Sequence, residues 1–152
     1  MPLNKAFEGR EFPPPPPYEV TEQSIIEFAD AIGDPNPVHR DPVAAKEAGY
    51  DAIIAPPTYL TKLNFIYGPA VLGDPDLGLN YAMVVHGEQE YEFTRPVKAG
   101  DVLIAKPSIS KIFAKGRNEF IVTEARIETT QGEQVAVARS TIVSRGTAEQ
   151  EA

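Results

Sequence analysis

The sequence predicts a single α+β domain, because helical and strand-like patterns occupy different parts of the chain. Up to about residue 67, apolar side chains recur at the spacing of helices. From Asn80 onward, apolar and polar side chains alternate with a period of two, which indicates strands. A helical segment between these two parts is apolar on nearly all sides and must therefore be buried. Antiparallel strands that follow the helices can form the sheet that covers it.

Two short helices are expected before the buried one. Thr21 can cap the first of them, and Gly33 suits its end, because glycine readily leaves the helical conformation. Asp41 and Pro42 are typical of the cap and first position of a second helix, which is expected to end at Gly49.

The buried helix is expected over residues 58–67 and should end there, because Gly68 and Pro69 interrupt the pattern. Four strands should follow, separated by turns that contain Gly100, Gly116 and Gly132. Their expected ranges are 80–94, 101–113, 118–130 and 135–144.

The two ends of the chain are expected to differ from the domain at residues 18–146. Residues 1–17 include five consecutive prolines, residues 13–17, which favour a stiff polyproline II conformation. This run is either a ligand for a proline-binding module or a rigid N-terminal strap, and the lack of basic neighbours favours the strap. Residues 147–152 are expected to be a flexible tail.

Composition excludes several classes of function. A net charge of −8 argues against a nucleic-acid partner or an anionic membrane, since both require a basic surface. The absence of cysteine excludes disulfides, thiolate nucleophiles and cysteine-based metal sites. Apolar stretches are shorter than the ~18 residues that span a bilayer, and the N-terminus lacks the apolar run of a signal peptide. A cytoplasmic protein is expected.

The stretch GDPNPVHRDP, residues 33–42, is the strongest candidate site. Its prolines restrict the backbone, so the side chains of Asp34 and His39 can be held in place at a small entropic cost. Histidine exchanges a proton near neutral pH, and a neighbouring carboxylate can act as a second acid or base. Asn36 can supply orienting hydrogen bonds. Because these residue types are also common in turns, an ordinary loop is the alternative.

Other kinds of site have little support. A metal site is not expected, because the second histidine, His86, lies on a different element. There is no G-x-S-x-G nucleophile elbow and no phosphate-binding glycine loop. No cofactor is predicted.

Residues 28–60, FADAIGDPNPVHRDPVAAKEAGYDAIIAPPTYL, resemble the MaoC-like family of (R)-specific enoyl-thioester hydratases and (3R)-hydroxyacyl-ACP dehydratases. The family signature is GD-x-N-P-x-H-x-D, followed by an entry to a buried helix. The later RPVKAGD turn, residues 95–101, also matches, and the similarity extends from about Tyr18 to Val143. This resemblance implies the hot-dog fold, in which an antiparallel sheet wraps a long central helix.

The resemblance also implies a reaction and its residues. Asp34 and His39 match the catalytic pair, which would activate one water and hydrate a trans-2-enoyl thioester reversibly. Asn36 matches an asparagine that supports the loop or the water. The substrate would be an acyl-CoA or acyl-ACP, and no cofactor would be needed, because the reaction only moves protons and water between neighbouring carbons.

One departure from the family concerns the thioester carbonyl. Where the family has His-Gly-Met, this chain has Pro56-Pro57-Thr58. The family glycine polarises the carbonyl with its backbone N–H, which Pro57 lacks. The N–H of Thr58 at the start of the helix is a candidate replacement.

The Ala-Pro-Pro-Thr variant resembles a subgroup of N-terminal MaoC-type dehydratase domains. This subgroup includes one subunit of heterodimeric dehydratases, which can lack the Asp/His pair and serve mainly to bind the acyl chain. Two hypotheses follow: a hydratase that acts as a homodimer, or a non-catalytic, acyl-binding subunit paired with a second hot-dog subunit. Thioesterases share the fold, but the Asp-x-Asn-Pro-x-His pattern argues against hydrolysis.

Two further sets of residues are candidates for substrate contacts. The acyl chain is expected to lie along the buried helix, against Tyr59, Leu63, Phe65 and Tyr67. Basic residues near the strand turns either bind the phosphates of the acyl carrier or are solvated loop charges: Arg95, Lys98, Lys111, Lys115 and Arg117.

Overall fold

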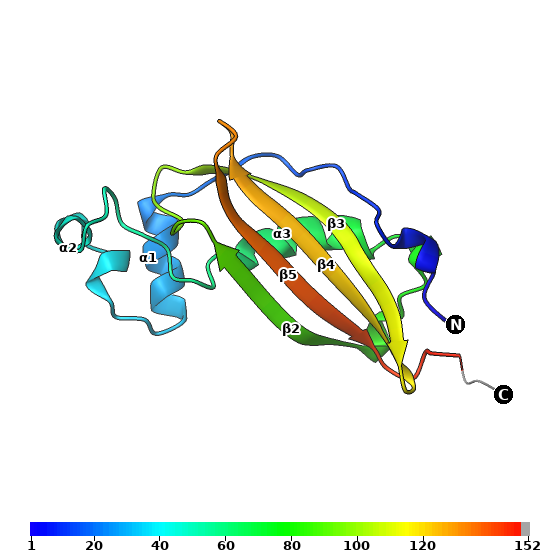
Figure 1. Ribbon diagram of the computed structural model, residues 1–152. Coiled ribbons are helices and arrows are strands. Elements are labelled where there is room, and N and C mark those ends of the chain that lie inside the picture. Colours follow the sequence, from blue (N-terminus) through cyan, green and yellow to red (C-terminus); the bar gives the residue numbers. More distant parts are fainter. Residues whose placement is uncertain (150–152) are drawn as a thin grey trace.

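A five-stranded antiparallel sheet curls around one helix in the computed structural model, which describes residues 1–149 (Figure 1). The strand order is β1-β3-β4-β5-β2. This arrangement is the hot-dog fold, and it confirms the predicted α+β class. The strands are β1 (Tyr18–Glu19), β2 (Val84–Phe93), β3 (Val102–Lys115), β4 (Asn118–Thr129) and β5 (Gln134–Ser144).

The four long strands lie close to where the period-two pattern predicts them. Buried and partly exposed side chains alternate along β4, so that Ile121, Ala125 and Ile127 enter the core. β2 begins at Val84 rather than Asn80. The side chain of Asn80 accepts a hydrogen bond from the N–H of Ala82 and caps a short 3₁₀ turn instead.

The central helix α3 (Thr61–Leu72) begins later and ends later than the sequence predicts. Residues 57–60 already turn in the helical sense. The N–H of Thr61, however, bonds to the carbonyl of Thr58, only three residues earlier, and this spacing is tighter than that of an α-helix. The predicted interruption at Gly68 and Pro69 is wrong. Helix α3 continues through both residues, because burial of Tyr67 and Val71 outweighs the typical ~3 kcal/mol cost of an interior proline.

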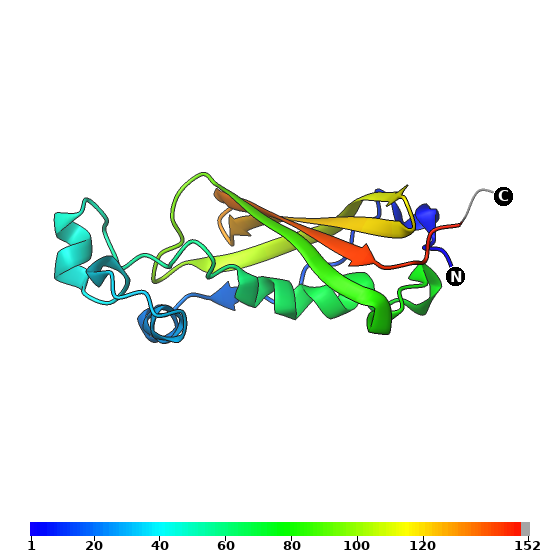
Figure 2. The same ribbon diagram turned by 90° about the horizontal axis from the view of Figure 1, so that it is seen from below.

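Helices α1 (Glu22–Ala31) and α2 (Pro42–Glu47) lie beyond one end of the sheet, in a region that we call the overhang, residues 21–52 (Figures 1 and 2). Both predicted caps are present. The Thr21 side chain accepts from the N–H of Ser24, and the Asp41 side chain accepts from the N–H of Val43. The overhang carries the GDPNPVHRDP stretch.

The N-terminal strap packs as part of the domain. Leu3 and Phe7 are buried in the common core. Beside Pro107 the strap pairs with the outer edge of β3, where Phe12 donates to the Pro107 carbonyl (3.0 Å) and Glu11 forms a bridge with Ser108. Pro107 can occupy this edge of the sheet, because proline lacks the backbone N–H that a central strand must donate to its neighbours.

The predicted flexible tail falls partly outside the described residues, which end at 149. Within the described part, the Thr147 hydroxyl donates to Glu119 (2.7 Å), and the N–H of Ala148 donates to the carbonyl of Arg117 (3.2 Å).

Candidate active site

Asp34 and His39 are held in a loop of successive turns between α1 and α2. The Asp34 carboxylate accepts from the N–H of Asn36 (3.0 Å). The Asn36 side-chain oxygen accepts from the N–H of Val38 (3.2 Å) and caps a 3₁₀ turn, Pro37–His39. Each polar side chain therefore bonds to the backbone two residues further on, as in Asx turns, and Asn36 supports the loop.

The two predicted acid/base groups meet. His39 Nε2 lies 3.2 Å from Asp34 Oδ2, and His39 Nδ1 lies 2.7 Å from the carbonyl oxygen of Ile54. Since a carbonyl can only accept, Nδ1 carries a hydrogen and donates it. Nε2 is then the nitrogen that can exchange a proton, and it faces the carboxylate. The His39 side chain is 6% exposed and that of Asp34 is 30% exposed, so the carboxylate is the more accessible partner.

The side chain of Arg40 fixes the loop to helix α1. Its guanidinium donates to the carbonyl of Asp34 (2.7 Å) and to the carboxylate of Asp30 (2.7 Å), which links the loop to the last turn of α1. The N–H of Asp34 also donates to the carbonyl of Ala29 (2.9 Å). The backbone of the acidic residue is therefore fixed on both sides.

A cavity of about 710 Å³ opens in front of Asp34 and His39. We call it the His39 cavity. Pro57 lines it. Sequence analysis missed Tyr50, Ile54 and Phe93 as parts of this site, because they lie outside the Asp34–His39 loop, in the α2–α3 connection and on β2, and carry no recognisable motif. The complete lining is Asp34, Asn36, Val38, His39, Ala48, Tyr50, Ile54, Ala55, Pro57, Phe93, Thr94, Arg95, Pro96 and Val97.

A second cavity of about 760 Å³ lies between α3 and the sheet, and we call it the helix cavity. Residues of α3 line one side of it, and residues of β2, β4 and β5 line the other. Thr58 lines this cavity and not the one in front of His39. The lining is Thr58, Thr61, Asn64, Phe65, Tyr67, Gly68, Pro69, Val71, Leu72, Tyr81, His86, Gln89, Tyr91, Thr123, Ser140 and Ile142.

The four residues expected along the acyl chain divide into two pairs. Phe65 and Tyr67 line the helix cavity. Tyr59 and Leu63 line neither of the two large cavities and are buried in the core, where the Tyr59 hydroxyl lies 2.7 Å from the Ser24 hydroxyl. A buried helix sends side chains in all directions, so only some of its apolar residues can face one cavity.

Neutral polar groups form a connected cluster in the helix cavity. Gln89 Oε1 accepts from Asn64 (3.0 Å) and from the Ser140 hydroxyl (2.6 Å). The Tyr67 hydroxyl donates to Asn64. Burial raises the pKa of the Tyr67 and Tyr91 hydroxyls, so both remain protonated at neutral pH. None of the described residues that line this cavity is an Asp, Glu, Lys or Arg.

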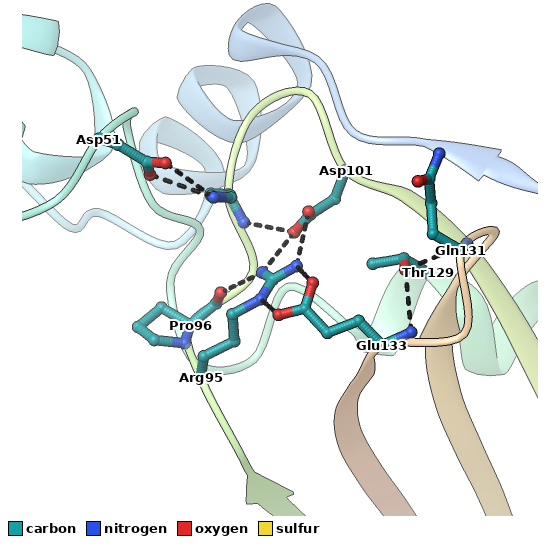
Figure 3. A network of polar contacts seen from close by, with 8 residues as sticks. Asp51, Arg95, Pro96, Asp101, Thr129, Gln131 and Glu133 are labelled. Carbon is teal, nitrogen blue, oxygen red and sulfur yellow. Dashed lines mark hydrogen bonds and ion pairs between the residues drawn. The ribbon is translucent and has the colours of Figure 1, made fainter.

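The basic residues near the turns are committed to other contacts or lie far from the site. Arg95 is ion-paired with Asp101 and Glu133 (Figure 3), and Lys98 is ion-paired with Asp51 (2.9 Å). The cation of Lys111 lies over the ring of Phe113. Lys115 ends β3 and Arg117 lies in the β3–β4 turn, at the end of the sheet opposite the overhang (Figure 1). The structure therefore favours structural and solvated roles for these charges.

No group of three or more His, Cys, Asp or Glu side chains is arranged to hold a metal ion within residues 1–149. Within the same range, no helix is both long and apolar enough to cross a membrane.

The family described as "FAS1-like, dehydratase domain region" matches residues 6–138. The chain belongs to this family. A protein of Saccharopolyspora erythraea called "UPF0336 protein" is 50% identical over 149 residues, which are 98% of this chain and 96% of the relative.

Solved structures agree with the family assignment. A chain of the HadBC complex, a 3R-hydroxyacyl-ACP dehydratase from Mycobacterium tuberculosis, is 28% identical with a TM-score of 0.80, and the match covers 90% of this chain and 96% of that one. A structure described as "MaoC-like dehydratase" is 25% identical with a TM-score of 0.86, over 93% of this chain and 43% of that one. The predicted resemblance to MaoC-like dehydratases is thereby confirmed.

Proposed function

We propose that the protein catalyses the reversible addition of water to trans-2-enoyl thioesters of CoA or acyl carrier protein, giving (R)-3-hydroxyacyl thioesters. The observation that carries this proposal is the 3.2 Å pair of His39 Nε2 and Asp34 Oδ2 at the wall of a cavity. Membership of a dehydratase family supports the reaction class. The pair supplies the two acid/base groups that the reaction needs, and no cofactor enters.

The chemistry follows from the protonation of the ring. The carbonyl of Ile54 holds the hydrogen on His39 Nδ1, so Nε2 and the Asp34 carboxylate can each accept a hydrogen bond from one water in the His39 cavity. In hydration, one group takes a proton from the water as its oxygen bonds to C3 of the enoyl thioester. That proton passes across the 3.2 Å contact to the other group, which delivers it to C2, so both groups end in their starting protonation states. Dehydration reverses both transfers. The thioester therefore gains one molecule of water in hydration and loses one in dehydration.

The negative charge that develops on the thioester oxygen needs a hydrogen-bond donor. Pro57 lines the His39 cavity but has no N–H. Thr58 is the next backbone donor along the chain, and the structure places it at the wall of the neighbouring helix cavity. As a proposed donor, the N–H of Thr58 would therefore act from the boundary between the two cavities.

We propose the helix cavity as the site of the acyl chain. Pro57 and Thr58 are neighbours in sequence and line different cavities, and Tyr91 and Phe93 do the same on β2. The two cavities therefore approach each other at the start of α3. A lining that includes Phe65 and Tyr67 and no Asp, Glu, Lys or Arg suits an acyl chain, while the cluster of polar side chains is compatible with polar atoms on that chain.

The variant Gly68→Leu is expected to lose activity on long substrates and to keep it on crotonyl-CoA. Gly68 lines the helix cavity, and a Cβ added there meets nothing within 4 Å, so a leucine side chain can occupy the cavity without disturbing the backbone. The measurement is kcat/KM for enoyl-CoA chains of increasing length. Gly68→Ala is the matched control, because it gives a similar gain in helix propensity but fills little space. An equal effect of both variants on all chain lengths would contradict the assignment.

We also propose that the active protein is a dimer, either with a second copy or with a second hot-dog subunit. β2 is an edge strand of the sheet, and it carries the exposed side chains of Val85 (40%) and Phe93 (38%). On α3, Phe65 is 78% exposed. An unpaired edge beside exposed apolar side chains is a typical docking surface. The name of the HadBC neighbour shows that such chains can assemble in complexes.

Light scattering of the purified protein is expected to give the mass of a dimer, and Val85→Lys should give a monomer. Lysine on an edge strand opposes edge-to-edge pairing. The control Val43→Lys changes a valine on α2 that is more exposed than Val85, 64% against 40%, and should leave the dimer intact. A stable monomer of the unmodified protein at micromolar concentration would exclude the homodimer and favour a heterodimer.

Purified protein alone should hydrate crotonyl-CoA and a longer trans-2-enoyl-CoA, which is followed by the loss of the enoyl-thioester absorbance. The product should be the (R)-3-hydroxyacyl thioester. Absence of turnover with both CoA and ACP substrates would favour the alternative function, a non-catalytic subunit that binds the acyl chain. The missing N–H of Pro57 is the observation that supports this alternative. The cytoplasmic location stays a prediction.

A further inference from the structure

The turn at residues 95–101 is closed by an ion pair between its first and last residues (Figure 3). Arg95 donates two hydrogen bonds to the carboxylate of Asp101, at 2.8 and 2.9 Å. Two parallel bonds of this kind fix the geometry more strictly than a single contact. The Asp101 side chain is only 5% exposed, so its charge depends on these partners.

Both ends of the ion pair make further contacts that hold the turn in place. The Asp101 carboxylate also accepts from the N–H of Lys98 inside the turn (2.9 Å). Arg95 donates to Glu133 in the β4–β5 turn (2.8 and 3.1 Å), which anchors the turn to the sheet. The turn is thus a rigid projection of the sheet, and Arg95 is not free to bind an anion.

This rigid turn carries the segment that orients His39. The N–H of Ala55 donates to the carbonyl of Val97 (2.7 Å), and the N–H of Ala99 donates to the carbonyl of Ile53 (3.0 Å). These two hydrogen bonds lie on either side of Ile54. The carbonyl of Ile54 accepts from His39 Nδ1, and its N–H donates to the carbonyl of Val38.

The same turn also holds the beginning of the overhang. The N–H of Val20 donates to the carbonyl of Asp101 (2.8 Å), and the N–H of Gly100 donates to the carbonyl of Val20 (2.8 Å). Val20 directly precedes the cap of α1, and α1 leads to Asp34. The turn therefore connects the sheet to both sides of the Asp34–His39 loop.

We infer that Arg95 and Asp101 are positioning residues for His39, acting through the 95–101 turn and the carbonyl of Ile54. The inference has two parts. The predicted effect on the reaction rests on the proposed function, whereas the predicted choice of which His39 ring nitrogen carries the proton does not. A correctly placed Ile54 carbonyl keeps the hydrogen on Nδ1. If the turn shifts, the Asp34 carboxylate at 3.2 Å draws the hydrogen to Nε2 instead.

The test is the tautomer of His39 in Asp101→Asn, measured from the nitrogen chemical shifts of the ring. The chain has two histidines, and a His86→Asn background leaves His39 as the only signal. Neutral His39 should carry its proton on Nδ1 in the parent protein and shift toward Nε2 in Asp101→Asn. The matched control Asp51→Asn also changes a carboxylate that pairs with this turn, but one whose side chain is 76% exposed, and it should leave the tautomer unchanged.

Enzymatic activity provides a second readout. Asp101 does not line the His39 cavity, so Asp101→Asn should lower kcat about ten- to a hundredfold and leave KM unchanged. If Asp101→Asn does not fold, Arg95→Lys replaces it, because it keeps the charge but cannot make the two parallel bonds. A folded variant with an unchanged tautomer would overturn the inference, whatever its activity. A changed tautomer in a protein that hydrates no thioester would sustain the inference and reject the proposed function.

Discussion

His39→Ala and Asp34→Asn are each expected to lower kcat for enoyl-thioester hydration about 10²- to 10⁴-fold. Both groups face the His39 cavity, and each is needed for one of the two proton transfers. His39→Ala removes the exchanging nitrogen, and Asp34→Asn replaces a base with an amide of the same shape. KM should change less, since neither group is proposed to bind the acyl carrier. The measurement is the steady-state rate of absorbance loss with crotonyl-CoA.

The double variant should be about as slow as either single variant, because groups that act as a unit do not contribute additively. Asp41→Asn is the matched control. It makes the same chemical change in the same ten-residue stretch, but asparagine caps a helix as well as aspartate does, and Asp41 does not line the cavity. Activity within twofold of the unmodified protein in either Asp34→Asn or His39→Ala would show that the pair is not the catalytic machinery.

Pro57→Gly and Pro57→Ala are both expected to increase kcat, by up to about 10²-fold. Each restores a backbone N–H at a residue that lines the His39 cavity, where the thioester carbonyl is proposed to lie. Because alanine restores the N–H with less flexibility than glycine, a shared gain would identify the N–H as the cause. Loss of the proline should destabilise the protein by only about 0.4–1 kcal/mol, which thermal unfolding can verify.

Pro56→Ala is the control for this pair, since it restores an N–H one residue earlier, at a position outside the lining of either large cavity. It should leave kcat unchanged. An unchanged or lower kcat in both Pro57 variants, with folding intact, would mean that another group already stabilises the oxyanion and that Pro57 does not limit the rate.

Local patterns predict most of this fold correctly. The alternation on β4 and the caps at Thr21 and Asp41 depend on neighbours within a few residues, so they can be recognised without the structure. The end of α3 could not be predicted in the same way. Its passage through Gly68 and Pro69 depends on burial against strands that come later in the chain.

The candidate site likewise has a part that local sequence patterns predict and a part that depends on distant residues. The short spacing of Asp34, Asn36 and His39 in a stiff loop made it predictable that they lie close together. By contrast, His39 Nδ1 bonds to the backbone carbonyl of Ile54. Every residue type has a backbone carbonyl, so this partner cannot be recognised from the sequence. The separation of Tyr59 and Leu63 from the helix cavity likewise depends on how α3 is rotated against the sheet.

Hydration of trans-2-enoyl-CoA in ¹⁸O-labelled water tests the central claim most directly. If Asp34 and His39 activate one water for addition, mass spectrometry should find a single ¹⁸O in the C3 hydroxyl of an intact 3-hydroxyacyl thioester. In deuterated water, one deuterium should appear at C2. Release of free CoA with ¹⁸O in a carboxylate would instead show thioester hydrolysis and would contradict the proposed hydratase.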